Sequence, residues 1–150
     1  MIKYIKGDAT APVGEGKKLI VHCCNDIGKW GAGFVLALSK KWKLPESCYL
    51  RWSTSPNFGL GQIQAVKVTN DITVINMIGQ HKTKSTSNET PIKYEAIERG
   101  LIKINKLAVD QGATFHAPRF GAGLAGGSWK LIELLIKQHI TVDVTIYDFG

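Results

Sequence analysis

The chain has 150 residues, 44% of them hydrophobic, so it can bury one substantial core but not two ordinary ones. We therefore expect a single domain spanning residues 1–150. No apolar run approaches the roughly 20 residues that cross a bilayer, and residues 1–6 lack the apolar region of a signal peptide. The cysteine count of three is odd, and Cys23 and Cys24 are adjacent, which argues against a disulfide framework. We expect a reduced, cytoplasmic protein without a membrane partner.

The net charge of +7 indicates an attraction to anions. Its lysines are dispersed along the chain, and the sequence has no arginine-rich run and no aromatic signature of RNA recognition. This pattern favours a solvated basic surface that also suits small anionic ligands. Nucleic acid remains an open alternative as a partner.

The first half of the chain predicts three parts: a strand pair, a helix pair and a hairpin. In chain order these are strands at 2–6 and 19–24, helices at 34–42 and 46–55, and strands at 63–68 and 73–78. Phe34, Leu38 and Trp42 lie on one face of the first helix, and we expect Pro45 to stop it. Asn70 and Asp71 are typical of a tight hairpin turn.

The second half continues the alternation of helices and strands. Residues 83–90 are polar and rich in Ser and Thr, which predicts a mobile loop. Pro91 fits the first turn of a helix that Gly112 closes. A strand at 114–117, a helical face at Trp129, Ile132 and Ile136 and a strand at 142–147 follow. This alternation predicts an α/β fold, a three-layer α/β/α sandwich with a mixed, mostly parallel central sheet.

Two glycine-rich segments each lie between a predicted strand and a predicted helix. They are residues 28–33 (GKWGAG) and residues 121–127 (GAGLAGG). Glycine allows positive φ and lets a ligand approach bare N–H groups, and the following helix N-terminus favours phosphate. Two such loops at the carboxyl ends of parallel strands predict a ligand with two phosphates, held from both sides. Neither loop has the spacing of a Walker or a Rossmann motif.

In these segments the chain resembles a macrodomain, the ADP-ribose-binding fold. The resemblance rests on Gly7-Asp8, on residues 22–28 leading into 30–33, on the strand 75–80, and on residues 118–127 followed by Trp129. It covers essentially the whole chain. The branch it is most similar to contains yeast-type ADP-ribose 1''-phosphate phosphatases and terminal ADP-ribose protein glycohydrolases.

The resemblance implies a ligand-binding role for a set of residues around one cleft. They are Gly7, Asp8, Ala9, Asn25, Gly28, Trp30, Gly31, Ala32, Gly33, Phe34, Pro118, Arg119, Gly121, Ala122, Gly123, Leu124, Ala125 and Tyr147. Asp8 would accept a hydrogen bond from the adenine amino group, and Asn25 would reach the distal ribose. Trp30 would shield that ribose or form part of the core. The segment from Tyr147 to Phe149 would close over adenine by stacking, or Tyr147 would simply be a core residue.

Catalytic residues are harder to assign from the sequence. The glycohydrolases have an aspartate where this chain has Ala125, and their lysine falls near Gln80 or His81. This difference disfavours their chemistry. For phosphomonoester hydrolysis, His81 would protonate the leaving oxygen or activate water, with Asp26 as another base. A Cys/His pair at His22, Cys23 and Cys24 is a weaker nucleophile candidate, and buried cysteines are the commoner reading.

Three functions follow as alternatives. The first is hydrolysis of the terminal phosphate of ADP-ribose 1''-phosphate. The second is binding of ADP-ribose, or of an NAD-derived nucleotide, without turnover. The third and weakest is hydrolysis of ADP-ribosyl groups on protein or nucleic acid. No Cys/His spacing matches a zinc site, so we expect no metal, and we expect no cofactor and a monomer.

Overall fold

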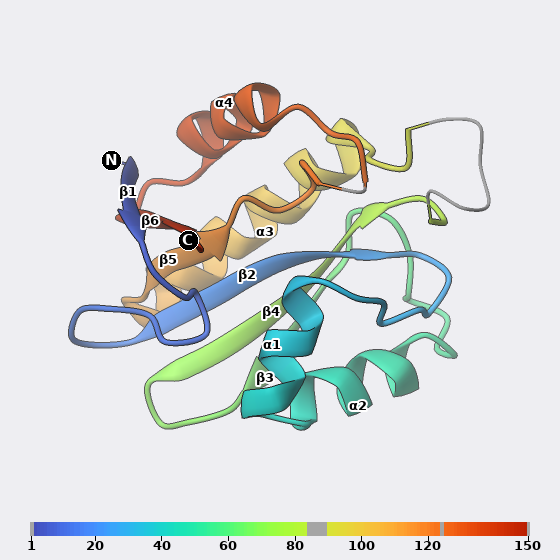
Figure 1. Ribbon diagram of the computed structural model, residues 1–150, viewed down its shortest axis with the longest axis horizontal. Coiled ribbons are helices and arrows are strands. Elements are labelled where there is room, and N and C mark those ends of the chain that lie inside the picture. The colour runs from blue at the N-terminus through green and yellow to red at the C-terminus, as the bar shows by residue number, and fades with distance from the viewer. Residues whose placement is uncertain (1, 84–89, 124, 150) are drawn as a thin grey trace.

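A computed structural model describes residues 2–83, 90–123 and 125–149. Six strands form one sheet in the order β1-β6-β5-β2-β4-β3 (Figure 1). The strands are β1 (Ile2–Lys6), β2 (Lys18–Asn25), β3 (Ile63–Lys67), β4 (Ile72–Gln80), β5 (Thr114–Pro118) and β6 (Val144–Asp148). All neighbouring pairs are parallel except the β3–β4 hairpin. The prediction of a mixed, mostly parallel sheet is therefore confirmed.

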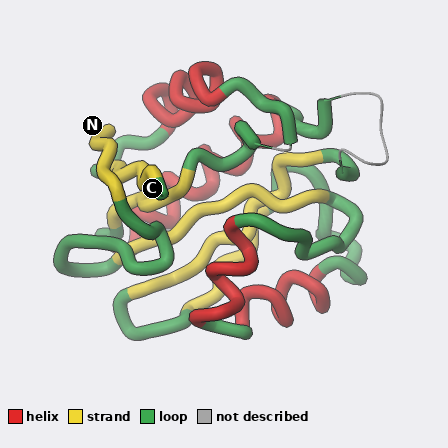
Figure 2. Tube along the Cα trace, viewed as in Figure 1, coloured by secondary structure: helices red, strands yellow, loops and turns green. Residues whose placement is uncertain are grey.

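Two pairs of helices cover the two faces of the sheet (Figures 1 and 2). They are α1 (Phe34–Lys41) and α2 (Leu44–Trp52) on one face, and α3 (Tyr94–Gln111) and α4 (Trp129–His139) on the other. Alternate residues of β2 face opposite layers, because side chains along a strand alternate in direction. Leu19 and Val21 pack into the core formed with α3 and α4, whereas Ile20 packs against Leu38 of α1. The three-layer architecture is thus as predicted.

Both prolines that were expected to mark helix ends have other roles. Pro45 lies in the first turn of α2, where its missing N–H costs nothing, and α1 ends earlier at Lys41. Pro91 precedes α3 instead of starting it: its carbonyl accepts a hydrogen bond from the His81 N–H, and Ile92 bridges to Gln80. The predicted loop at 83–90 falls largely on residues 84–89, which lie outside the described residues.

The sheet has a seam between β2 and β5. These strands pair only from Lys18 to Ile20, after which β2 continues beside β4 and β5 continues beside β6. The chain leaves β2 towards α1 on one face and leaves β5 towards α4 on the other. A crevice forms at such a switch point, and it is where ligands bind in open α/β sheets. Within the described ranges, no helix is both long and apolar enough to cross a membrane.

Candidate functional site

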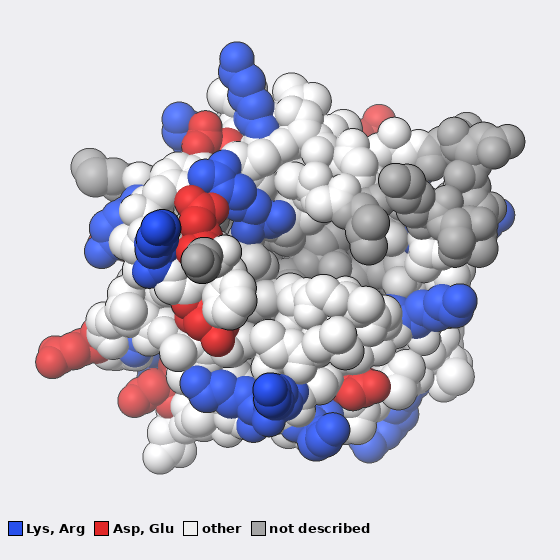
Figure 3. Space-filling view, viewed as in Figure 1, with Lys and Arg blue, Asp and Glu red and all other residues white. Residues whose placement is uncertain are grey.

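A cleft of about 1000 Å³ opens where β2 and β5 separate. Its walls are the loop after β2 and the loop after β5, which are the two glycine-rich segments. Among the described residues that line it, Lys29 and Arg119 carry the only formal charges. On the face seen in Figure 3, the positive side chains lie mostly around the edge, and the described surface at the centre is uncharged. The cleft therefore suits an anionic ligand.

The structure brings most of the predicted binding residues into this cleft. Those that line it are Asn25, Trp30, Gly31, Ala32, Gly33, Phe34, Pro118, Arg119, Gly121, Gly123 and Ala125. Those that do not are Gly7, Asp8, Ala9, Gly28, Ala122 and Tyr147, and Leu124 lies outside the described residues. Sequence reasoning missed Lys29, Val35, Thr83 and Phe120. Lys29 and Phe120 lie within or beside the glycine-rich segments, so the motifs themselves could have indicated them.

Asn25 folds the first loop around its own side chain. Its Oδ1 accepts hydrogen bonds from the N–H groups of Ile27 and Lys29, both at 3.1 Å, and its Nδ2 donates to the Lys29 carbonyl at 2.6 Å. Asn25 is 6% exposed. The predicted contact with a distal ribose stays a prediction, and the shape of the loop depends on this side chain.

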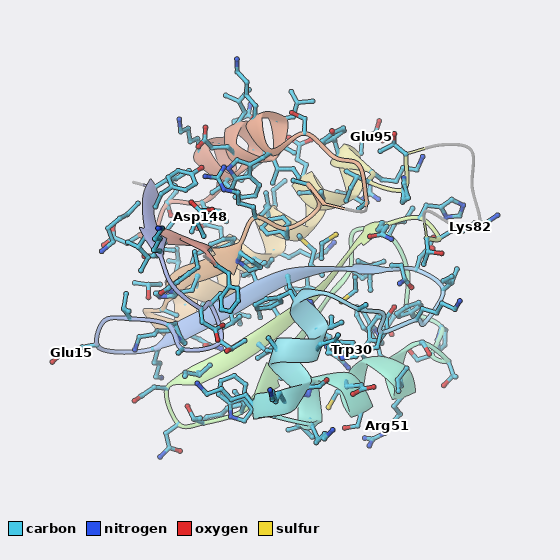
Figure 4. The ribbon with its side chains drawn as sticks, in the orientation of Figure 1. Glu15, Trp30, Arg51, Lys82, Glu95 and Asp148 are labelled. Atoms are coloured by element: carbon cyan, nitrogen blue, oxygen red, sulfur yellow. The ribbon has the colours of Figure 1, made fainter. Side chains whose placement is uncertain are left out.

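Trp30 forms a wall of the cleft near the end of β2. Figure 4 shows it between this strand and the helices α1 and α2. Its indole Nε1–H donates to Ser39 Oγ at 2.7 Å, and its ring lies edge-on to His22 with centroids 5.4 Å apart. A ring held on two sides keeps a fixed orientation.

The N-terminus of α1 is open to the cleft. Its N-cap is Gly33, with φ 91°, and no side chain accepts a hydrogen bond from the first turn. A Cβ added at Gly31 or Gly33 would meet no atom within 4 Å, so the backbone there is accessible. In α4, by contrast, the Ser128 side chain accepts from the Leu131 N–H. Of the two helix N-termini that the sequence predicts as anion sites, α1 is the uncapped one.

Arg119 lies at the edge of the second loop in a fixed position. Its Nε and Nη2 donate to the two carboxylate oxygens of Asp148, at 2.6 and 3.1 Å. Its guanidinium lies 4.8 Å from the Tyr4 ring centroid and 5.7 Å from that of Trp129. The ion pair lowers the pKa of Asp148 and raises that of Arg119. Figure 4 places Asp148 at the end of β6, beside β1.

Asp8 lies just after β1, at the same edge of the sheet as the two loops. Its Oδ1 accepts from the N–H and the hydroxyl of Thr10, both at 2.8 Å. Among the described residues, no group donates to Oδ2. Asp8 is half-buried, so this oxygen is a candidate acceptor for a ligand.

Tyr147 lies in the sheet rather than on an open surface. It is 3% exposed, its hydroxyl accepts from the Val13 N–H at 2.9 Å, and it lies 2.8 Å from His116 Nδ1. Burial raises its pKa. The predicted stacking on adenine stays untested, but the exposed aromatic ring at this end of β6 is Phe149, at 86%.

Asp26 and His81, the predicted catalytic pair, are in contact. His81 Nδ1 lies 2.7 Å from Asp26 Oδ2, and the Lys82 N–H donates to Asp26 Oδ1 at 2.8 Å. Both carboxylate oxygens of Asp26 therefore hold the turn after β4, where Lys82 has φ 58° and projects outward (Figure 4). Neither Asp26 nor His81 lines the cleft, although Gln80 and Thr83 do.

His22 and the two cysteines that follow it line the cleft, with His22 and Cys24 buried and Cys23 half-buried. His22 Nε2 lies 2.5 Å from Asn76 Oδ1, and burial lowers its pKa to about 4. Burial also raises the pKa of Cys23 to about 12 and that of Cys24 well above its usual range. Protonated thiols are poor nucleophiles, so the cluster is suited to packing. Within the described part of the chain, no three His, Cys, Asp or Glu residues are grouped as a metal site.

The sheet order, the seam and the two glycine loops define an α/β/α sandwich with a ligand cleft at its switch point. No protein-family model matches the chain. It is similar in structure to a macrodomain protein from Streptomyces coelicolor, with 44% identity, a TM-score of 0.88 and all of both chains covered. The chain therefore belongs to the macrodomain family. A Bacteroides thetaiotaomicron protein of unknown function is 50% identical with a TM-score of 0.96, over 99% of this chain and 98% of that one.

More distant relatives extend the comparison. The mouse chromodomain-helicase-DNA-binding protein 1-like is 32% identical over 93% of this chain, which spans only 16% of that protein's length. An ADP-ribose 1''-phosphate phosphatase of Candida albicans is 25% identical, over 98% of this chain and 99% of that protein. The structure of Thermosipho africanus DarTG in complex with ADP-ribose shares the fold, with a TM-score of 0.75 and 15% identity over 97% of this chain and 41% of that one.

Proposed function

We propose that this macrodomain binds ADP-ribose in the cleft at the seam. The observation that carries the proposal is the pair of glycine loops facing each other across about 1000 Å³, with the uncapped N-terminus of α1 on one side. Bare N–H groups and a helix N-terminus bind phosphate without cationic side chains. A diphosphate between the loops would then direct one end of the ligand towards β1 and the other towards Trp30. The Thermosipho structure with ADP-ribose supports this ligand.

The residues at and beside the cleft suit the two ends of ADP-ribose. Asp8 does not line the cleft itself, but it is half-buried just after β1, and its Oδ2 would accept from the adenine amino group and give base specificity. Asn25 ends β2 and Trp30 follows it in the first loop, so the distal ribose would sit beside the loop that Asn25 holds. Lys29 and Arg119 add positive charge at the edges of the cleft.

We propose further that His81, which does not line the cleft but lies between Gln80 and Thr83, which do, takes part in removing the terminal phosphate from ADP-ribose 1''-phosphate. Water would attack phosphorus, the bond to the ribose oxygen would break, and a proton from His81 Nε2 would pass to that oxygen. Asp26 supports this role because it binds Nδ1 at 2.7 Å and so orients the ring. With both of its oxygens engaged, Asp26 acts by orienting His81 and not as a separate base. The Candida phosphatase, similar over nearly its whole length, supports the reaction class.

Two alternatives remain, each with one discriminating residue. A binding module would hold ADP-ribose without turnover, and His81 would then serve only the turn after β4. An ADP-ribosyl hydrolase acting on modified protein or nucleic acid would need a carboxylate that Ala125 does not supply. Ala125 lines the cleft, so the position that would need the carboxylate faces the cleft and has a methyl side chain instead.

The decisive experiment combines calorimetry and a phosphate assay on one sample. We expect ADP-ribose to bind, and ADP-ribose 1''-phosphate to release phosphate over several turnovers. His81→Ala should reduce that release at least about 100-fold, the usual contribution of a general acid, and leave ADP-ribose affinity within about twofold.

The matched control is His139→Ala. His139 also pairs with a carboxylate, Glu98 at 2.7 Å, but on α4 away from the cleft. It should change neither binding nor release. Undiminished release by His81→Ala would refute its catalytic role, binding without any release would favour the binding module, and no binding would reject the ligand itself.

A further inference from the structure

Helix α2 packs behind the first glycine loop without reaching the ligand cleft. None of its described residues lines the cleft, yet two of its side chains are connected by hydrogen bonds to residues that do, one directly and one through Ser39 of α1. These are Glu46 and Tyr49, three positions apart on the face of α2 that packs inward. Their contacts with the loop are made by hydrogen bonds between buried or half-buried groups.

Tyr49 holds Asn25. The Tyr49 side chain is fully buried, and its hydroxyl donates to the Asn25 main-chain oxygen at 2.7 Å and lies 2.9 Å from Asn25 Oδ1. Oδ1 is the same atom that gathers the N–H groups of Ile27 and Lys29. The hydroxyl therefore fixes the rotamer on which the first turn of the loop is built. Burial raises the pKa of Tyr49, so the hydroxyl keeps its proton.

Glu46 holds Trp30 through one intermediate. The Trp30 indole N–H donates to Ser39 Oγ at 2.7 Å, and the Ser39 hydroxyl donates to Glu46 Oε1 at 3.0 Å. The Trp30 ring also lies 5.4 Å from the Tyr49 ring. Asn25 and Trp30 are the cleft residues of this loop whose side chains make the hydrogen bonds described above. Both are therefore connected to α2.

We propose that Tyr49 and Glu46 are positioning residues for the ribose-phosphate end of the cleft, an inference that rests on the proposed binding of ADP-ribose. They keep the 25–33 loop in its binding conformation before the ligand arrives, so the ligand does not have to order the loop. The effect is local to one end of the ligand. Asp8, at the adenine end, follows β1, and its carboxylate accepts hydrogen bonds from Thr10 rather than from α2.

The test is Tyr49→Phe, which removes the hydroxyl and keeps the ring that packs on Trp30 and Phe58. We expect ADP-ribose affinity to fall about fivefold, in the range of one lost buried hydrogen bond. Affinity for AMP, which does not extend to the distal ribose, should stay unchanged. Ser39→Ala should give the same selective loss through Trp30.

Ser47→Ala is the matched control on the same helix, because the Ser47 hydroxyl donates only to the Leu44 carbonyl on the exposed face. It should affect neither ligand. Hydrogen exchange of the Ile27 and Lys29 amides gives a readout that needs no ligand. Exchange should accelerate in Tyr49→Phe and not in Ser47→Ala, since these amides depend on Asn25 Oδ1.

Equal losses for AMP and ADP-ribose would overturn the inference, because they would indicate general destabilisation. Unchanged ADP-ribose affinity with unchanged exchange would overturn it as well. If the unaltered protein binds no ADP-ribose, the proposed function fails on its own. The exchange of Ile27 and Lys29 then decides whether α2 positions the loop.

Discussion

At the scale of single residues, the second glycine loop is limited by space as much as by backbone conformation. The Gly127 N–H donates to the Gly121 carbonyl at 2.8 Å and closes the loop on itself. A Cβ at Gly127 would lie 2.4 Å from that same carbonyl oxygen and 3.0 Å from Ile92. A Cβ at Gly123, four residues earlier, would meet no atom within 4 Å. A side chain is therefore excluded at Gly127 by its neighbours, whereas Gly123 has room for one.

Gly127→Ala should destabilise the protein by about 3 kcal/mol, because the contact with a main-chain oxygen forces the loop to move. Gly123→Ala should change the free energy of unfolding by less than about 0.5 kcal/mol. Urea unfolding of both variants measures the difference. Similar stability of the two variants would contradict the packing of the loop described above.

At the scale of elements, tyrosine hydroxyls tie loops to the layers behind them. Tyr147 of β6 accepts from the Val13 N–H at 2.9 Å and so holds the segment between β1 and β2. Tyr94 of α3 accepts from the Ser128 N–H at 2.8 Å and holds the end of the second glycine loop. Tyr49 does the same for the first loop. Each hydroxyl stabilises a different loop near the carboxyl edge of the sheet.

The two accepting tyrosines allow a reciprocal test. Tyr147→Phe should speed hydrogen exchange of the Val13 amide and leave Ser128 unchanged, and Tyr94→Phe should do the reverse. Tyr94→Phe should lose about 1 kcal/mol of stability, the net contribution of one hydrogen bond, and Tyr147→Phe should lose more, because its hydroxyl also contacts the buried His116 Nδ1 at 2.8 Å. Acceleration of both amides in either variant would mean that the loops move together.

At the scale of the whole molecule, two buried histidines make stability depend on pH. Burial lowers the pKa of His22 and of His116 to about 4, whereas a histidine in an unfolded chain has a pKa near 6.5. For His116, the nearby charges of Lys18 and Lys3 contribute to this lowering of the pKa after burial. Between these values the unfolded chain binds protons that the folded chain does not. Stability from this source is present above pH 6.5 and is lost as the pH falls towards 4.

Lowering the pH from 7 to 5 should therefore cost about 2 kcal/mol for each of the two histidines. Urea unfolding at several pH values gives the slope. His116→Gln should remove about half of the difference attributed to the pair. A variant with the same slope as the unaltered protein would show that folding does not lower the pKa of His116, so that the folded and unfolded chains bind its proton equally.

Periodicity was sufficient to predict the sheet and its helices, because the continuous apolar run in β2 and the spacing of apolar residues in α1 are local properties. The two glycine-rich segments likewise predicted both walls of the cleft, because a run of glycines is a local feature of the sequence. The prediction that Pro91 lies in the first turn of a helix was wrong, because Pro91 pairs with His81, ten residues earlier in the chain, and no local pattern indicates that contact. The contact of Tyr49 with Asn25 joins residues 24 positions apart, and no local pattern distinguishes this tyrosine from any other core aromatic.

The seam between β2 and β5 has a mechanical consequence. Only three residue pairs join the half of the sheet built from β2, β3 and β4 to the half built from β1, β5 and β6. One cleft wall belongs to each half of the sheet. A ligand bound to both loops would therefore hold the two halves together across the short β2–β5 pairing. Occupancy of the cleft and cohesion of the two halves would then be linked, and each would strengthen the other.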